Sequence, residues 1–211
     1  MLKEYKTIIL EEQNSAGVLK LNRPKKLNAF NMQMLDDMLD AIDQVNKNDN
    51  IKSLIITGSG RAFCAGADLS LGEKTFDKSF DTKAKYESDF RRDAGGILSL
   101  KIYNSLKPVI AACNGDAVGI GATMQLPADI RIASSKSRFG FVFAKRGIVP
   151  DGCASWFLPK IIGIPMALEL CYSGKIIDAS DALKIGLINY LVDESELMKK
   201  AYEMSDLLCD S

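Results

Sequence analysis

Apolar positions in the first third of the chain follow two different periods. Residues 8–21 carry two apolar runs separated by Asn14-Ser15-Ala16-Gly17, which predicts two short strands joined by a turn. Asn31 then precedes a segment with apolar residues at helical spacing, so a helix is expected from there to about Asn46. Its apolar residues are Met34, Leu35, Met38, Ala41, Ile42 and Val45. Its solvent face is expected to carry Asp36, Asp37, Asp40 and Asp43.

The rest of the chain alternates continuous apolar runs with helical patterns. Short runs at 52–57, 108–112 and 130–133 are typical of strands buried on both faces. Strands that alternate with helices predict an α/β domain with a largely parallel sheet. Helices are expected at 97–106, from Gly119 to about Leu126, and at 166–172, 180–185 and 194–208, with a further strand at 187–192.

Composition excludes some partners. The 27 Lys and Arg residues balance 27 Asp and Glu residues, whereas nucleic-acid binders usually show a basic excess. No segment reaches the eighteen or so apolar residues that span a bilayer, and the first six residues lack the apolar core of a signal peptide. We therefore expect a cytoplasmic protein without nucleic-acid or membrane partners. The five cysteines are widely spaced, which predicts reduced thiols rather than a zinc site or redox pair.

The chain contains no histidine, and this narrows its chemistry. Ser-His and Cys-His nucleophile pairs and imidazole metal ligands are excluded. Acid–base chemistry must therefore use Asp, Glu, Lys, Tyr or Cys. No metal site is predicted.

Two glycine-rich turns each follow a predicted buried strand. Residues 61–69 read Arg-Ala-Phe-Cys-Ala-Gly-Ala-Asp-Leu, and residues 114–121 read Asn-Gly-Asp-Ala-Val-Gly-Ile-Gly. Small residues let the backbone approach a ligand closely, and the second turn opens a predicted helix, where N–H groups favour anions. Either turn taken alone could equally be a tight turn with a packing role.

The two turns lie within a longer series of motifs that resembles the crotonase (enoyl-CoA hydratase/isomerase) superfamily. The ordered resemblance runs from about Asn22 to Val192. It includes Leu-Asn-Arg-Pro at 21–24 with Asn-Ala at 28–29, both glycine turns, Lys-Pro at 107–108, Ala-Asp at 128–129, Phe-Gly at 139–140, Gly-Ile-Val-Pro at 147–150, Leu-Pro at 158–159 and Ala-Leu-Lys-Ile-Gly-Leu at 182–187.

This resemblance implies a fold and an assembly. The expected fold is a crotonase-like spiral of β-β-α units, with a core at 1–192. Family members generally carry further C-terminal helices, so residues 193–211 are expected to begin a C-terminal helical region, which is either naturally short or lacks its tail in this sequence. The family's usual assembly implies a homo-oligomer, a trimer or a dimer of trimers.

The resemblance also implies a binding site for an acyl-CoA thioester. The backbone N–H groups of Ala67 and Ile120 would form an oxyanion hole for the thioester oxygen. Ile120 stands where the family often has Gly, but the main chain still supplies the donor. No cofactor is expected, because coenzyme A is part of the substrate. The residues implied at the CoA and substrate site are Lys26, Ala29, Ala65, Asp68, Leu69, Gly121, Phe143 and Trp156; for Lys26 a solvated surface role is equally open.

The reaction depends on which carboxylates lie over the acyl carbons. Hydratases of the family carry two glutamates, and the matching positions here are Thr123 and Phe143. Asp151 follows the Gly-Ile-Val-Pro segment, where double-bond isomerases, including the ring-epoxide isomerase of phenylacetate breakdown, commonly carry Asp or Glu. A 1,3 proton shift needs one base, so the resemblance implies isomerisation with Asp151 as the acid/base. The apolar residues Phe143, Val149, Trp156 and Phe157 are expected to raise its pKa.

Other interpretations remain open from the sequence. Asp151 could cap a helix that begins near Gly152. Hydration of a 2-enoyl-CoA, or acyl-CoA binding without catalysis, would also fit the family. A dehalogenase-like reaction with Asp151 as nucleophile is disfavoured, since such enzymes use a histidine to activate water. Residues 71–92 are expected to shape the acyl pocket.

Overall fold

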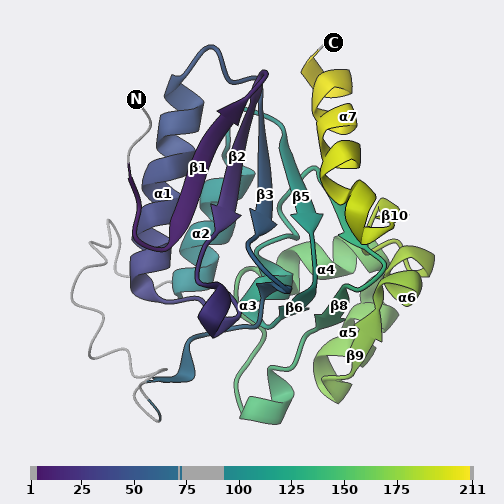
Figure 1. Cartoon of the computed structure of the whole chain (residues 1–211). Helices are drawn as coiled ribbons and strands as arrows, with labels where there is room; N and C mark the ends of the chain where they lie inside the picture. Colours follow the sequence, from purple (N-terminus) through teal and green to yellow (C-terminus); the bar gives the residue numbers. More distant parts are fainter. Residues whose placement is uncertain (1–3, 71, 73–92, 210–211) are drawn as a thin grey trace.

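The computed structural model describes residues 4–70, 72 and 93–209, which form an α/β fold with two sheets (Figure 1). The segment predicted to shape the acyl pocket, 71–92, lies outside the described residues except for Gly72. The larger sheet has six strands in the order β1-β2-β3-β5-β7-β10, and only β1 and β2 pair antiparallel. Its strands are β1 (Ile8–Gln13), β2 (Ala16–Leu21), β3 (Ser53–Gly58), β5 (Val109–Cys113), β7 (Ile130–Ser134) and β10 (Tyr190–Val192).

A smaller sheet lies beyond the ends of β3 and β5 (Figure 1). Its order is β4-β6-β8-β9. Successive segments add one strand to the large sheet, one to the small sheet and then a helix: β3-β4-α2, β5-β6-α3 and β7-β8-α4. This repeat is the β-β-α spiral that the family resemblance implied. The small strands are β4 (Ala62–Cys64), β6 (Asp116–Val118), β8 (Arg138–Gly140) and β9 (Ile176–Asp178).

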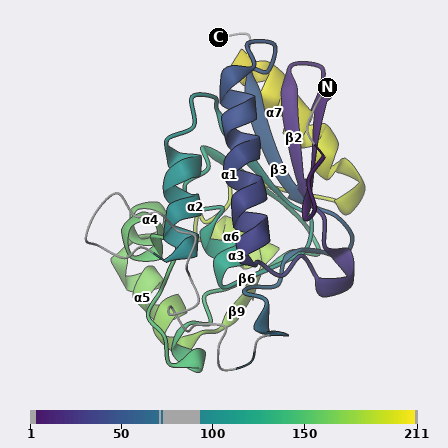
Figure 2. The ribbon, with the colours of Figure 1, turned by 90° about the vertical axis from the view of Figure 1, so that its left-hand side faces the viewer.

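Helices cover both faces of the large sheet, as Figure 2 shows with α1 and α2 in front and α7 behind. The row of sheet residues Val18, Ile55 and Ile110 lies in register and packs against α7. Neighbours that point the other way, such as Leu19 and Ile56, join the core beneath α1 and α2. The helices are α1 (Met32–Lys47), α2 (Ala94–Tyr103), α3 (Ile120–Thr123), α4 (Ala154–Ile162), α5 (Ile164–Ser173), α6 (Ala179–Lys184) and α7 (Leu197–Cys209), with 3-10 turns η1 (Pro24–Lys26), η4 (Ala144–Arg146) and η5 (Glu194–Glu196).

Most predicted elements are present, but several differ in extent: α2 begins at Ala94 rather than near Ile97, and β10 covers only the end of the strand predicted at 187–192. The β1–β2 turn is only Asn14-Ser15, because Ala16 and Gly17 already pair with Gln13 and Glu12. The helix after Gly119 ends at Thr123 rather than near Leu126. The four strands of the small sheet were not predicted.

Asp37 was wrongly placed on the solvent face of α1. It is buried, and its carboxylate accepts hydrogen bonds from the Thr7 N–H at 2.9 Å and the Thr7 hydroxyl at 2.7 Å. The side chain therefore ties the start of β1 to α1, which satisfies the polar groups that burial would otherwise leave unpaired.

No helix in the described part of the chain is both long and apolar enough to cross a membrane. All five cysteines lie in the described residues, and none of them forms a disulfide there.

The packing of α7 yields a stability prediction. Met204 is buried against the large sheet, whereas Leu207 on the same helix is 63% exposed. We expect Met204→Ala to lower the free energy of unfolding by roughly 2–4 kcal/mol, because it removes buried apolar contacts and leaves a cavity. Leu207→Ala should stay within about 0.5 kcal/mol of the parent chain. Denaturant titration of both variants checks this, and equal losses would contradict the packing of α7.

Candidate active site

The two glycine-rich turns meet because they leave neighbouring strands of the small sheet. β4 and β6 are parallel, so the segments that follow them emerge at the same edge. The first carries Gly66 with φ +109°, and the second carries Gly119 with φ +55°, a region that favours glycine. A Cβ built on Gly119 would lie only 4.0 Å from the Gly66 Cα. The backbones that carry Ala67 and Ile120 are therefore close neighbours.

Among the described residues, the surrounding backbone hydrogen bonds do not use the N–H groups of the two predicted donors. Around Ala67, the Phe30 N–H donates to the Gly66 carbonyl at 2.8 Å, and the Asp68 N–H donates to the Phe30 carbonyl at 2.8 Å. This bridge uses groups on either side of the Ala67 N–H but not that group itself. Ile120 is the first residue of α3, where an N–H has no acceptor within the helix. Because α3 has only one turn, its dipole adds little, and the direction of the two N–H groups matters more.

Close backbone contact between the turns explains the glycine at 121. A Cβ on Gly121 would collide with the Cys64 carbonyl, and one on Gly115 would collide with the Arg61 carbonyl. Gly121 was predicted to contact substrate, and the structure places it at this packing contact between α3 and β4. The same contact sets the position of the Ile120 peptide.

Asn28 holds the segment beneath the first turn. It is fully buried, adopts φ +55° and accepts a hydrogen bond from the Arg23 N–H at 2.8 Å. Its amide donates to the Ser59 and Ala62 carbonyls at 2.9 and 2.8 Å. The Asn-Ala motif that carried the family resemblance thus has a physical role, since one side chain joins residues 23, 59 and 62.

The predicted CoA-binding residues of the first half come together on two adjacent segments. The Ala65 N–H donates to the Leu27 carbonyl at 3.0 Å, which joins 26–29 to 65–69. Lys26 and Leu69 are exposed, and Ala29 and Ala65 are half-buried.

Asp68 differs from its neighbours because its carboxylate is already engaged. Hydrogen bonds from the Ser70 hydroxyl and from Arg23, the latter an ion pair at 2.7 Å, lower the pKa of Asp68 to about 2. Arg23 also donates to the Ala29 carbonyl. The Asp68 side chain therefore anchors the loop that presents Ala67.

Asp151 lies between η4 and α4, against α3. A Cβ on the next residue, Gly152, would lie 3.5 Å from the Ile120 side chain and would collide with the Thr123 hydroxyl. The Asp151 Oδ1 atom is buried and has no hydrogen-bond partner among the described residues. Burial, followed by the negative charge of Asp93, raises the pKa of Asp151 to about 7, while the Thr123 hydroxyl opposes this rise.

The raised pKa agrees with the sequence prediction, but its causes differ in part. Phe143 and Phe157 are buried, whereas Val149 is 80% exposed and Trp156 is 61% exposed. The Trp156 ring instead lies beneath the Lys160 ammonium, 4.2 Å from the ring centroid. Asp93 was missed altogether, because the helix it caps was expected to begin only near Ile97.

The alternative role of Asp151 as a helix cap is not seen. Helix α4 begins at Ala154, and its N-cap residue is Cys153. The Asp151 carbonyl accepts from the Ala154 N–H at 3.0 Å, so only the main chain of Asp151 contributes to the helix start.

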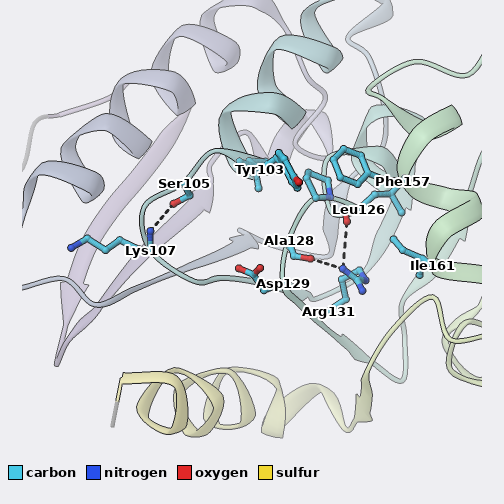
Figure 3. Close-up of a pocket in the computed structure, with 11 residues that line it drawn as sticks. Tyr103, Ser105, Lys107, Leu126, Ala128, Asp129, Arg131, Phe157 and Ile161 are labelled. Carbon is cyan, nitrogen blue, oxygen red and sulfur yellow. Dashed lines mark hydrogen bonds between the residues drawn. The ribbon is translucent and has the colours of Figure 1, made fainter. Parts of the chain in front are cut away.

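A separate pocket of about 290 Å³ lies near the other end of α2 (Figure 3). Among the described residues that line it are Tyr103, Phe157 and Arg131. The Arg131 guanidinium donates to the Ala128 and Leu187 carbonyls at 2.6 and 2.9 Å, so its donors serve the fold. None of these lining residues belongs to the predicted site. Within the described ranges, no three Cys, Asp or Glu side chains are grouped to hold a metal ion.

Comparisons with known proteins identify the family of the chain. The family model described as enoyl-CoA hydratase/isomerase matches residues 11–211. Enoyl-CoA hydratase ACTT3 of Alternaria alternata is 38% identical over 195 residues, which are 92% of this chain and 63% of that protein. The 1,2-epoxyphenylacetyl-CoA isomerase of Escherichia coli strain K12 is 34% identical over 206 residues, which are 94% of this chain and 74% of that protein.

A solved structure of an enoyl-CoA hydratase from Bacillus anthracis superposes with a TM-score of 0.86 at 28% identity, covering 98% of this chain and 78% of that one. The chain thus spans less than two thirds of the Alternaria relative and about three quarters of the other two. The crotonase-like α/β fold expected from the sequence motifs is confirmed.

Because Gly121 lies against the Cys64 carbonyl where α3 meets β4, a methyl group added at Gly121 should strongly reduce activity. Gly121→Ala should displace the Ile120 peptide and lower kcat/KM by roughly 100-fold, the cost typical of losing one oxyanion donor. Gly147→Ala is the control, because its Cβ meets no atom within 4 Å and only its φ of +67° adds strain. Steady-state assays of the folded variants with an enoyl-CoA substrate check this, and near-parental rates for Gly121→Ala would contradict it.

Asp151 should also lower the stability of the protein at neutral pH. Its pKa lies near 7 in the folded state and near 3.8 in the unfolded chain. Between these values only the folded state keeps the proton, so stability falls as the pH rises from about 4 to about 7. We expect Asp151→Asn to be more stable than the parent at pH 8, by on the order of 2–4 kcal/mol, and to lose much of this advantage at pH 4.

Urea denaturation at both pH values measures this difference. Asp206→Asn, on the exposed face of α7, is the matched control and should change little at either pH. An Asp151→Asn variant that gains no stability at pH 8 relative to pH 4 would show that the carboxylate is not raised in pKa by burial.

Proposed function

Because the chain belongs to the enoyl-CoA hydratase/isomerase family, we propose that it shifts a carbon–carbon double bond in an enoyl-CoA, with Asp151 as the single acid/base. The observation that carries this proposal is the buried, unpartnered Asp151 oxygen beside the Ile120 turn. A pKa near 7 suits a group that must take up a proton and return it at neutral pH.

In this mechanism the thioester oxygen accepts hydrogen bonds from the N–H groups of Ala67 and Ile120. The Asp151 carboxylate removes a proton from C2 of a 3-enoyl thioester, and the electron pair moves toward the thioester oxygen. The two N–H groups stabilise that negative charge more than they stabilise the neutral ground state, at roughly 3 kcal/mol per donor. The protonated Asp151 then delivers the proton to C4, which leaves a 2-enoyl thioester and restores the carboxylate.

Thr123 and Phe143 stand at the positions of the two hydratase glutamates, and their environment supports one acid/base rather than two. Thr123 is fully buried, and its hydroxyl contacts the Ile120 carbonyl at 3.5 Å. Phe143 is also buried and has no group that can transfer a proton. A hydroxyl at Thr123 can orient Asp151, but it does not ionise near neutral pH.

Hydration of a 2-enoyl-CoA is the second candidate, favoured by the names of several relatives, including the Alternaria protein. It requires a positioned water and a proton donor, tasks usually shared by two carboxylates. The structure offers Asp151 for one task, and Asp93 is the nearby second carboxylate. Its Oδ2 atom already accepts hydrogen bonds from two backbone N–H groups, so this oxygen is engaged in holding the main chain.

The CoA moiety would lie along residues 26–29 and 65–69, with Lys26 available to its phosphates. Coenzyme A enters with the substrate, so the proposed reaction requires no separate cofactor. The proposed working form is a cytoplasmic homo-oligomer, a trimer or a dimer of trimers.

We expect Asp151→Asn to lower the rate of double-bond migration by roughly 10²–10⁴-fold, because the amide cannot accept the C2 proton. Acyl-CoA affinity should remain close to that of the parent, since the amide keeps the shape of the carboxyl. Ultraviolet absorbance with a 3-enoyl-CoA follows formation of the conjugated product, and calorimetric titration with a non-reacting acyl-CoA measures affinity. Asp206→Asn is the charge-matched control.

The same assay with a 2-enoyl-CoA separates the candidates. Loss of its conjugated absorbance would show hydration instead of isomerisation. Binding of both thioesters without any change in absorbance would support the non-catalytic alternative. Unchanged isomerisation in Asp151→Asn would exclude Asp151 as the base.

A further inference from the structure

The first turns of α2 hold the residue after Asp151 by both of its backbone polar groups. The Gly152 N–H donates to the Asp93 carboxylate at 3.1 Å, and the buried Ser99 hydroxyl donates to the Gly152 carbonyl at 2.8 Å. Asp93 is also the N-cap of α2, because the same oxygen accepts from the Gly96 N–H at 2.7 Å. One carboxylate therefore fixes the start of the helix and the turn that carries Asp151.

Glycine is required at the contact itself. Gly152 has φ +60°, and a Cβ on Gly95 would lie 3.0 Å from an Asp93 oxygen and 3.3 Å from the Gly152 Cα. The backbones of α2 and of the Asp151 turn are thus in direct contact. A displacement of the Asp93 side chain would therefore also displace the turn that carries Asp151.

Asp93 is also the nearby charge that acts on Asp151. Burial is the larger of the two causes that raise the pKa of Asp151, and the negative charge of Asp93 is the second. Of the other described charged residues on adjacent elements, Lys101 pairs with Asp43 through its ammonium, and Lys160 lies over the Trp156 ring. Lys145 packs along Gly174, and Arg146 is exposed on η4. Helix α3 contributes no charged residue.

We propose that Asp93 is a positioning residue that acts through Asp151: it holds the turn that aims the base, and its negative charge strengthens that base. This inference rests on the proposed function of Asp151. A carboxylate that ionises less readily is the stronger base, and a neighbouring like charge has this effect. Asp93 itself does not contact the reacting atoms.

Asp93→Asn separates the charge from the hydrogen bonds. Asparagine is a favoured N-cap residue, and its amide oxygen can still accept from Gly96 and Gly152. In the parent, kcat/KM should rise with pH and level off above about 7, where Asp151 becomes ionised. In Asp93→Asn this rise should move to lower pH by roughly half a unit to one unit.

Ser99→Ala is the matched control, because it removes the other hydrogen bond to Gly152 without changing charge. It should lower kcat, because the turn that carries Asp151 is held less firmly. The pH at which kcat/KM rises should stay at the parental value. Asp93→Ser, which also keeps a favoured cap, replaces Asp93→Asn if the latter does not fold. An unchanged pH profile in a folded, active Asp93 variant would overturn the proposal.

A titration without substrate keeps this inference distinct from the proposed function. Carbon-detected NMR of side-chain carboxyls follows Asp151, assigned by its absence in Asp151→Asn. A lower titration midpoint in Asp93→Asn but not in Ser99→Ala supports the coupling, and equal midpoints in all three proteins overturn it. If the parent shows no turnover of 3-enoyl-CoA, the proposed function fails, while this titration still decides whether Asp93 acts on Asp151.

Discussion

The close approach of two parallel backbones in the small sheet is the constraint on which the site depends. Gly121 lies against the Cys64 carbonyl and Gly115 against the Arg61 carbonyl, at distances where no Cβ fits. Because β4 and β6 run parallel at this contact, the turns that follow them emerge side by side. Two segments more than fifty residues apart are thereby brought together, and only main-chain atoms make this contact.

Around this contact, polar side chains hold the backbone segments in place. Asn28 and Asn114 each bridge backbone groups that the two sheets leave unpaired, and Asp68 pairs with Arg23. The fully buried Asn28 is satisfied by several partners, which makes its burial tolerable. Asp151 differs from these residues, since one of its oxygens is buried without a partner among the described residues. Its environment destabilises the ionised form, and this is the property that a base requires. Stability and reactivity therefore oppose each other at this residue.

Asp93 is a second carboxylate that both stabilises the fold and affects the ionisation of Asp151. An N-cap aspartate normally stabilises a helix, and here it also faces the turn of another acid. A neighbouring like charge disfavours ionisation of a carboxyl, so the Asp93 charge adds to the effect of burial on Asp151. The start of α2 and the turn that carries Asp151 are thus linked through one side chain rather than through a chain of contacts.

The sequence by itself determined the parallel sheet, the two glycine turns, the family and the choice of Asp151 as candidate acid/base. Those features are local or depend on ordered motifs, and periodicity and residue identity suffice to read them. The tertiary structure alone decided the small sheet, because strands of three residues are too short to show a period. It also decided the burial of Asp37, the exposure of Trp156 and the placement of Asp93 beside Asp151. These depend on partners far away in the chain, such as Thr7 for Asp37 and Gly152 for Asp93, and no local pattern encodes which distant backbone a carboxylate will meet.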